Sequence, residues 1–320
     1  MRWDVVVVGS VNVDLVLTVP RHPNPGETLI GGSGQVFAGG KGANQAVAAA
    51  RLGARTAMIG AVGDDANASV ALHELEAADV DVHAVTHTSG PTGLAVVTLA
   101  DGGENTIVVV PGANASVTPE VVDDAAPVIR AARVCLLQAE IPLASVERAA
   151  DLAAVSGVRV VLNVAPAAPF PLATLRLADP LVLNEHEAAL LLNWLGTTSP
   201  AGRHGHPSPD ATPEPVVGRA AALAASRTLR EHGVRSVVIT LGGDGVVGAG
   251  AEGEWSLPAR DVPVRDTTGA GDAFVGAFAA RLAAGSTQLE AAVTATRAAA
   301  FSVQRLGAQA SYPWKDDPLP

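Results

Sequence analysis

The sequence predicts an α/β fold, a doubly wound and mainly parallel sheet flanked by helices, with a small β-sheet lid. Short apolar runs rich in β-branched residues recur along the 320 residues and are typical of strands buried on both faces. Alanine-rich stretches of helical length lie between them, an alternation that predicts βαβ units. Two regions break this alternation and indicate a second, smaller sheet.

The first apolar run, Val5–Val8, ends at Gly9 and predicts a central strand of the parallel sheet. Similar runs predict the strands Val134–Leu137, Val158–Leu162, Leu181–Leu183 and Val237–Thr240. The alanine-rich stretches predict the helices Ala43–Leu52, Ala66–Ala77, Ser145–Val155, Ala220–His232, Ala273–Ala284 and Leu289–Gln304.

The two exceptional regions are Val11–Phe37 and Gly93–Val110, which contain strand-like sequence and turns but no intervening helix. In the second, Asp101-Gly102-Gly103 separates two β-rich runs, a strong hairpin signal. We expect the two regions to pair into a separate sheet over the strand ends of the main domain, and we call this sheet the lid.

Composition restricts the class of protein. A net charge of -11 argues against a protein that coats nucleic acid, although it allows a nucleotide substrate. The only cysteine, Cys135, cannot form an internal disulfide and fits a reducing compartment. The N-terminal residues lack the apolar core of a signal peptide, and no apolar run reaches transmembrane length. We therefore expect a soluble, cytoplasmic protein with no membrane partner.

The segment Gly196–Gly218 is rich in Pro, Gly, Ser and Thr and predicts a mobile surface loop. Its His204 and His206 are spaced so that they could ligate a metal. Because no third ligand lies nearby in the sequence, a solvated loop is the favoured interpretation.

The strongest functional signal is the segment Asp266–Phe274, DTTGAGDAF, which precedes a predicted helix. Its small residues allow a tight turn, so that the amides of Gly269, Ala270 and Gly271 can hold an anion at the helix start. An acidic residue there suits chemistry, because Asp272 can take a proton from an attacking hydroxyl while the amides hold a transferred phosphoryl group. The alternative is that Asp272 only caps the helix.

A second glycine-rich segment, Gly39–Ala46, also begins a helix. It lacks the spacing of a P-loop. Its glycines allow a small ligand to approach the backbone, and Lys41 and Asn44 supply polar groups suited to a polyol. A helix cap with a surface lysine is the alternative.

The third signal is Asn12-Val13-Asp14, directly after the first buried strand. In an extended segment, residues two apart point the same way, so Asn12 and Asp14 would face one ligand. The Asp14 carboxylate could accept hydrogen bonds from two vicinal hydroxyls. Taken alone, a turn or a cap explains this tripeptide as well.

One glycine motif is misleading. Gly243, Gly245 and Gly248 match the spacing of a dinucleotide-binding fingerprint, which must begin a helix. Here Val246–Gly250 continues as strand-like sequence followed by a turn, which argues against a nicotinamide site and against a dehydrogenase.

Together these segments resemble the ribokinase-like carbohydrate kinase family over about Val5–Trp314. So many family motifs in the family's order make a highly specific match. They are Gly9–Asp14, Pro23–Thr28, Gly39–Ala54, Val62–Asp65, Gly112–Ala115, Leu136–Pro142, Asn184 with Glu187, Thr240–Gly245, Asp266–Phe274 and Gly307–Trp314.

The resemblance implies one kinase domain over residues 1–320, with the lid at about residues 11–37 and 93–110. It implies ATP-dependent phosphorylation of a free pentose such as D-ribose at O5, with Asp272 as the base. The residues that would then hold the sugar are Asn12, Val13, Asp14, Gly40, Lys41, Gly42, Ala43, Asn44 and Glu140.

For ATP, the resemblance implies a platform for adenine and its ribose made by Thr240, Leu241, Gly242, Gly243, Asp244 and Gly245, with further contacts from Asn184, Gly271 and Thr296. Glu187 would organise Mg²⁺ on the phosphates, through water. Thr296 departs from the family, which often has His or Asn there, so the nucleotide preference is less well defined.

The resemblance also implies an activating monovalent cation, usually K⁺. Its ligands would be the Asp266 carboxylate, the Ser311 hydroxyl and the carbonyls of Thr268, Ser302, Arg305 and Gly307. The ion would fix the loop that holds the anion. The resemblance further implies a homodimer formed through the lid, which would bury otherwise open sheet edges.

Other functions remain open at this point. A kinase of the same family acting on 2-deoxyribose, fructose or a nucleoside is the nearest alternative, although Asn12-x-Asp14 with the Gly40–Asn44 segment favours ribose. A catalytically inactive sugar-sensing protein on the same fold is disfavoured by the intact Asp266 and Asp272.

Overall fold

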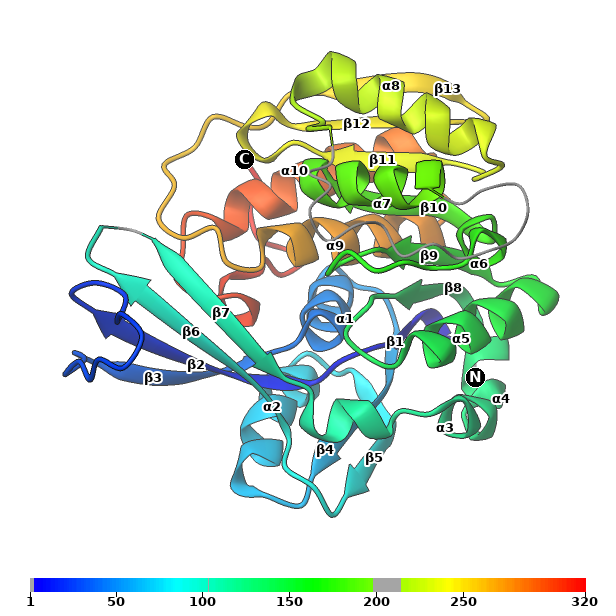
Figure 1. Ribbon diagram of the computed structural model, residues 1–320. Helices are drawn as coiled ribbons and strands as arrows, with labels where there is room; N and C mark the ends of the chain where they lie inside the picture. Colours follow the sequence, from blue (N-terminus) through cyan, green and yellow to red (C-terminus); the bar gives the residue numbers. More distant parts are fainter. Residues whose placement is uncertain (1–2, 103, 198–213) are drawn as a thin grey trace.

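The computed structural model describes residues 3–102, 104–197 and 214–320, whose strands form two sheets (Figure 1). The larger sheet has nine strands in the order β13 (Gly253–Leu257), β12 (Val246–Gly250), β11 (Val237–Thr240), β10 (Ala178–Asn184), β9 (Arg159–Asn163), β8 (Ala132–Leu137), β1 (Trp3–Val8), β4 (Thr56–Gly63) and β5 (Asp81–Thr88). From β11 to β5 neighbouring strands are parallel, whereas β12 and β13 are antiparallel to their neighbours. The predicted doubly wound, mainly parallel sheet is confirmed.

Helices cover both faces of this sheet, and β1 shows the reason. Val5 and Val7 belong to one hydrophobic core and Val6 and Val8 to the other, because successive side chains of a strand point to opposite faces. The first core is shared with α1 (Lys41–Arg51), α2 (Ala66–Ala77), α9 (Ala270–Ala283) and α10 (Gln288–Ser302). The second is shared with α3 (Pro119–Asp124), α4 (Ala126–Arg130), α5 (Leu143–Val155), α6 (Leu172–Leu175), α7 (Glu185–Thr197) and α8 (Gly218–Glu231). Among the described helices, none is both long and apolar enough to cross a membrane.

The lid is the second sheet, with the strand order β3 (Gly34–Gly39), β2 (Asn12–Val19), β6 (Gly93–Ala100) and β7 (Asn105–Val110). β6 and β7 form the predicted antiparallel hairpin, and β2 joins the two predicted regions by pairing in parallel with β6. The expected separate sheet is therefore confirmed. It extends away from the main domain in Figure 1, and only Gly9–Val11 separates its β2 from β1 of the main sheet.

Most predicted elements occur within a few residues of their predicted bounds, but several were missed. The strands β4 and β5 and the helix α7 were not predicted. The predicted loop Gly196–Gly218 lies mostly outside the described residues; α7 ends at Thr197 and α8 begins at Gly218, each within two residues of the predicted bounds. The intervening His204 and His206 lie outside the described residues. Three short 3₁₀ helices complete the described part: η1 (Gly112–Ser116), η2 (Gly242–Asp244) and η3 (Gln309–Ser311).

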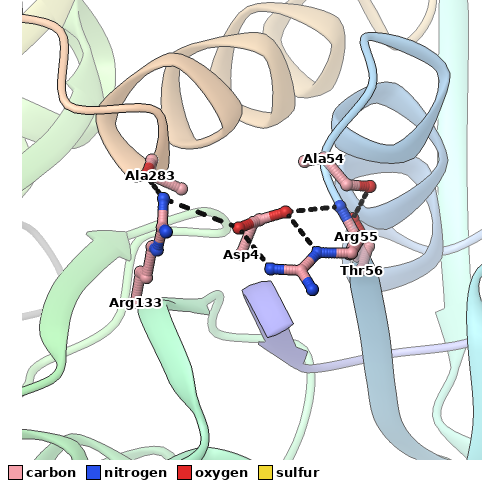
Figure 2. Close-up of polar contacts among 6 residues, drawn as sticks. All are labelled: Asp4, Ala54, Arg55, Thr56, Arg133 and Ala283. Carbon is pink, nitrogen blue, oxygen red and sulfur yellow. Dashed lines mark hydrogen bonds and ion pairs between the residues drawn. The ribbon is translucent and has the colours of Figure 1, made fainter. Parts of the chain in front are cut away.

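A polar cluster around Asp4 lies at the start of β1, at the end of the sheet opposite to the carboxyl ends of its parallel strands (Figure 2). The Asp4 carboxylate accepts hydrogen bonds from the Arg55 backbone N–H at 3.0 Å and from the Arg55 guanidinium, which lowers the pKa of Asp4. Arg133 lies 3.8 Å from the same carboxylate and donates to the Ala283 carbonyl at the end of α9. These contacts hold the C-terminal end of α9 against the sheet, while its N-terminal end reaches the candidate site.

Candidate active site

The candidate site lies where the carboxyl ends of parallel strands meet the N-terminal ends of α1, α7 and α9, which is where open α/β sheets bind ligands. A cleft of about 150 Å³ is lined there by Lys41, Asn184, Glu187, Thr240 and Asp272. These residues come from distant parts of the chain, and the fold brings the three strongest sequence signals into one region.

The start of α9 has the geometry of an anion site. Gly269 is the N-cap with φ of 71°, and a Cβ atom at this position would lie 2.5 Å from the Tyr312 Oη. The Ala270 N–H donates to the Thr267 carbonyl at 3.2 Å, whereas the Gly269 and Gly271 amides donate no hydrogen bond within the described residues. Of the three predicted amides, Gly269 and Gly271 are therefore the ones free to hold a phosphoryl oxygen.

Asp272 is held by two side-chain amides. Its Oδ2 accepts a hydrogen bond from Asn44 Nδ2 at 2.9 Å, and its Oδ1 accepts one from Gln45 Nε2 at 2.8 Å. Gly269 is the helix N-cap and makes no side-chain cap bond, so the alternative that Asp272 merely caps the helix is wrong. Asp272 is 7% exposed and lines the cleft, where a general base would have to lie.

Lys41 is the first residue of α1 and lies among four carboxylates. Attraction by Asp272 is the main cause that raises the pKa of Lys41; burial opposes it, and Glu140, Glu187 and Asp14 add to the rise. Lys41 is only partly exposed and lines the cleft, so the surface-lysine alternative is wrong.

Glu140 anchors the start of α1. Its Oε2 accepts hydrogen bonds from Ser10 Oγ at 2.6 Å and from the Lys41 backbone N–H at 3.0 Å. The Ser10 hydroxyl in turn accepts from the Gly42 N–H at 3.2 Å. The segment 40–44 is therefore joined to the loop after β1 and to the loop after β8.

Asn12 and Asp14 lie at the start of β2, where the lid leaves the main sheet, so a turn or a cap is excluded for them. Asn12 Oδ1 accepts a hydrogen bond from Asn114 Nδ2 at 2.6 Å. Asp14 makes no side-chain hydrogen bond within the described residues. Burial, followed by repulsion from Glu140 and Asp272, raises the pKa of Asp14 to about 7, with Lys41 opposing.

Asn184 and Glu187 bond to each other across the start of α7. The Asn184 N–H donates to Glu187 Oε2, the Glu187 N–H donates to Asn184 Oδ1, and both distances are 2.8 Å. Burial raises the pKa of Glu187 to about 6, although the Asn184 hydrogen bond and Lys41 act against it. This reciprocal pair leaves the Asn184 NH₂ group and one Glu187 oxygen for the cleft.

The segment predicted to hold the nucleotide follows β11. Thr240 lines the cleft, and η2 presents Gly242 and Gly243 to open space, since a Cβ atom on either would meet nothing within 4 Å. The chain then enters β12 and no helix, which confirms that Gly243–Gly248 is no dinucleotide fingerprint. Thr296 is buried on α10, and its hydroxyl has no partner within the described residues.

The residues predicted to hold a monovalent cation come from the segments 266–268 and 302–307 and from Ser311, and Asp266 bonds to the first two segments. Asp266 accepts hydrogen bonds from the Thr268 N–H at 2.9 Å and from the Gly307 N–H at 2.8 Å. Burial alone would raise the pKa of Asp266, but hydrogen bonding by the Thr268 side chain and by the Thr268 and Gly307 N–H groups outweighs it and lowers the pKa, so the group is an anion. The Ser311 hydroxyl is buried and donates to the Ala308 carbonyl, which leaves its lone pairs free to accept. The Ser302 carbonyl already accepts from the Arg305 N–H.

Several residues of the site were missed, and three of them hold predicted residues in place. Ser10 links Glu140 to α1, Asn114 orients Asn12, and Gln45 holds Asp272. All three lie inside recognised motifs, but a single sequence offers no signal that separates them from neighbouring polar residues.

The chain matches the pfkB family carbohydrate kinase model over residues 3–315. It is 37% identical to a ribokinase of Haemophilus influenzae over 100% of this chain and 98% of that protein, and 35% identical to a deoxyribokinase of Salmonella typhi over 97% and 95%. The structure of a ribokinase from Arabidopsis thaliana complexed with ribose and ATP aligns with a TM-score of 0.85 at 33% identity, covering 98% of this chain and 97% of that one. The chain therefore belongs to the pfkB family of carbohydrate kinases.

Proposed function

We propose that this protein phosphorylates D-ribose at O5 with ATP, acting as a single kinase domain with the lid as its cover. The observation that carries the proposal is the Asp272 carboxylate, which lines the cleft beside the free amides of Gly269 and Gly271. A base and an anion site so close together suit phosphoryl transfer to an alcohol. The similarity to ribokinases, one of them solved with ribose and ATP, supports the choice of substrates.

In this proposal the sugar lies between the lid and the start of α1. Asn12 and Asp14 approach it from β2, and Lys41 and Asn44 from α1, with Val13, Gly40, Gly42 and Ala43 shaping the backbone around them. Glu140 presents its second oxygen. A ring of such donors and acceptors is what a polyol requires for recognition.

The reaction proceeds by attack of the sugar O5 on the γ-phosphorus of ATP. The O5 proton moves to the Asp272 carboxylate, the bond between O5 and phosphorus forms, and the bond from phosphorus to the β,γ-bridging oxygen breaks to release ADP. The Gly269 and Gly271 amides hold the oxygens of the transferred group, and the Lys41 ammonium offsets their charge. Asp272 then returns its proton to water.

ATP would lie along Thr240–Gly245, because Gly242 and Gly243 leave open space for a flat base. Asn184, Gly271 and the Thr296 hydroxyl, which has no partner in the described part of the chain, would supply further contacts. Mg²⁺ would neutralise the phosphates when bound. Glu187 suits such an ion through water, since it is an oxygen ligand in the cleft that is ionised above a pH of about 6.

A panel of sugars tests the proposal directly. Because a site built to bind a hydroxyl leaves polar groups unpaired when that hydroxyl is absent, ribose should exceed 2-deoxyribose by at least about tenfold in kcat/KM. Fructose and nucleosides should be poor substrates. A coupled assay of ADP release over pentoses, hexoses and nucleosides gives the ratios. Preference for 2-deoxyribose, the substrate that the name of a deoxyribokinase relative indicates, would leave a sugar kinase but overturn the ribose assignment.

We further propose that K⁺ activates the enzyme through the Asp266 turn. The donor set fits, since it joins one ionised carboxylate to the Ser311 hydroxyl and the carbonyls of Thr268, Ser302, Arg305 and Gly307, all hard oxygens. Initial rates should be several-fold higher in potassium than in tetramethylammonium chloride. Asp266→Ala should abolish that difference, whereas Asp261→Ala, at an exposed position on the preceding loop, should keep it. Equal rates of the unaltered enzyme in both salts would exclude the site.

The lid is also proposed to form a homodimer. Its outer strand β7 exposes consecutive apolar side chains, with Ile107 58% and Val108 63% exposed, and Val36 on β3 is 51% exposed. A small sheet with such open edges gains stability by pairing with a second copy. Sedimentation at micromolar concentration should give a mass of twice 32.1 kDa, and Val108→Lys should shift it to the monomer. A monomer for the unaltered chain would reject the proposal.

We also propose a cytoplasmic location, to which the lone buried thiol of Cys135 is suited.

A further inference from the structure

A buried series of hydrogen-bonded side-chain amides leads from the main sheet to Asp272. Gln45, on α1, is completely buried, and its NH₂ group donates to Asn163 Oδ1 at 2.9 Å and to Asp272 Oδ1 at 2.8 Å. Its own Oε1 accepts from Gln138 Nε2 at 2.6 Å. Both N–H donors of the Gln45 amide and its oxygen therefore have hydrogen-bond partners.

The two residues at the ends of this hydrogen-bonded series, Asn163 and Asp272, determine which way the Gln45 amide points. Asn163 Nδ2 donates to the Val182 carbonyl at 3.2 Å, and a carbonyl can only accept, so Asn163 must present its oxygen to Gln45. The Asp272 carboxylate, acting as a base, likewise only accepts. Both facts place the NH₂ group of Gln45, and not its oxygen, toward Asp272.

Close packing of two helices makes this contact possible. α9 crosses α1 at Gly276, where a Cβ atom would lie 2.6 Å from the Ala48 Cβ and would also overlap the Gln45 carbonyl. Only glycine fits at this crossing, so the helix axes approach closely enough for a side chain of α1 to reach the first turn of α9.

We infer that Gln45 is a positioning residue for the catalytic base, an inference that deepens the proposed kinase function and rests on it. Gln45 holds Asp272 Oδ1 from the protein interior. The other oxygen, Oδ2, lies on the side of Asn44, one of the proposed sugar contacts. Gln45 therefore fixes the rotation of the carboxylate so that Oδ2 receives the proton of the sugar hydroxyl with its remaining lone pair.

Replacing Gln45 by methionine, which has nearly the same shape but no donor, tests this role. Since a small misplacement of a catalytic group is costly, Gln45→Met should lower kcat by about 10- to 100-fold and change KM for the sugar by less than about threefold. The matched control is Gln288→Met. Gln288 is also a buried glutamine whose NH₂ group donates to two oxygens, those of Ser236 and Asp179, but it has no contact with Asp272.

If Gln45 had only a structural role, both variants would unfold at lower temperature and neither would lose kcat once folded. Equal kcat values in the folded Gln45→Met and Gln288→Met variants would therefore overturn the inference. A crystal structure of Gln45→Met in which the Asp272 carboxylate keeps its orientation would overturn it as well.

A second variant, Gln45→Glu, tests the role through the pH dependence of kcat, which a purely structural role of Gln45 would not change. The introduced carboxyl faces two acceptors, Asn163 Oδ1 and Asp272 Oδ1, and can donate to one of them only when protonated. Its kcat relative to the unaltered enzyme should therefore rise as the pH is lowered from about 9 to about 6. A ratio that does not change with pH would contradict the inference.

These tests are separable from the choice of sugar. Gln45 contacts Asp272 and no proposed sugar ligand, so the comparison is made with whichever sugar the unaltered enzyme phosphorylates. If that sugar is not ribose, the proposed substrate is wrong while the ratios still decide the role of Gln45. Should the enzyme phosphorylate no sugar in the panel, the proposed function fails, and the orientation of Asp272 in the crystal structure decides the inference.

Discussion

Replacing Asp272 by asparagine should lower the turnover number by about 10²- to 10⁴-fold at saturating sugar, the usual contribution of a general base. The amides of Gly269 and Gly271 are untouched by this change, so ATP binding should persist. A coupled assay measures turnover, and calorimetry with an unreactive ATP analogue measures nucleotide binding. The control is Asp151→Asn, at an exposed position on α5, which should have normal activity.

The fold should tolerate Asp272→Asn for a specific reason. The new NH₂ group needs an acceptor, which Asn44 can supply by turning its amide over. Asn44 Oδ1 now accepts from Gln309 Nε2 at 2.8 Å, while Gln309 Oε1 has no partner within the described residues. If both amides reverse together, the number of hydrogen bonds is unchanged. Near-normal turnover of a folded Asp272→Asn variant would reject Asp272 as the base.

Replacing Asp14 by asparagine should stabilise the sugar-free protein at pH 8 and severely weaken ribose use. Since the pKa of Asp14 is raised from 3.8 to about 7 in the folded protein, folding favours its protonated form. The stability that the group contributes is therefore complete below a pH of about 4 and is lost as the pH rises through about 7. Above that pH the buried charge costs on the order of 2–4 kcal/mol, which the neutral asparagine avoids.

Urea unfolding of the sugar-free protein at pH 5 and pH 8 measures this effect. Asp14→Asn should gain more stability at pH 8 than at pH 5, whereas Asp101→Asn, at an exposed position of the lid, should gain little at either. Equal gains at both values would contradict the raised pKa. In the unaltered enzyme, the KM for ribose should rise as the pH falls below about 7, because a protonated Asp14 no longer accepts two hydroxyl hydrogen bonds.

Much of the architecture could be predicted because strands buried on both faces have a distinct sequence. Val5–Val8 is an unbroken β-branched run, and it forms the predicted interior strand of the main sheet. The neighbouring β4 has the sequence TAMIGAVG and is buried at every residue, yet its glycines and alanines have low strand propensity. Its burial follows from tertiary packing, which local sequence does not contain.

The candidate site was predictable where function requires an unusual residue. Asp272 next to glycines at a helix start conflicts with an anion site unless it has a chemical role, and this conflict made it visible. Gln45 shows the opposite case, since a glutamine within an alanine-rich helix is ordinary for an exposed position. Its burial becomes meaningful only when α9 brings Asp272 and β9 brings Asn163 within 3 Å of it.

The short connection Gly9–Val11 between β1 and β2 has a mechanical consequence. Asn12 and Asp14 belong to the lid, whereas Asn44 and Asp272 belong to the main domain. Gly40 alone separates β3 of the lid from α1, so the separation of the two groups would change with any rotation of the lid about such short connections. A sugar hydrogen-bonded to both groups would hold the lid at one angle to the main domain. The angle of the lid, a sheet of four strands, would then depend on whether one small molecule is bound at its base.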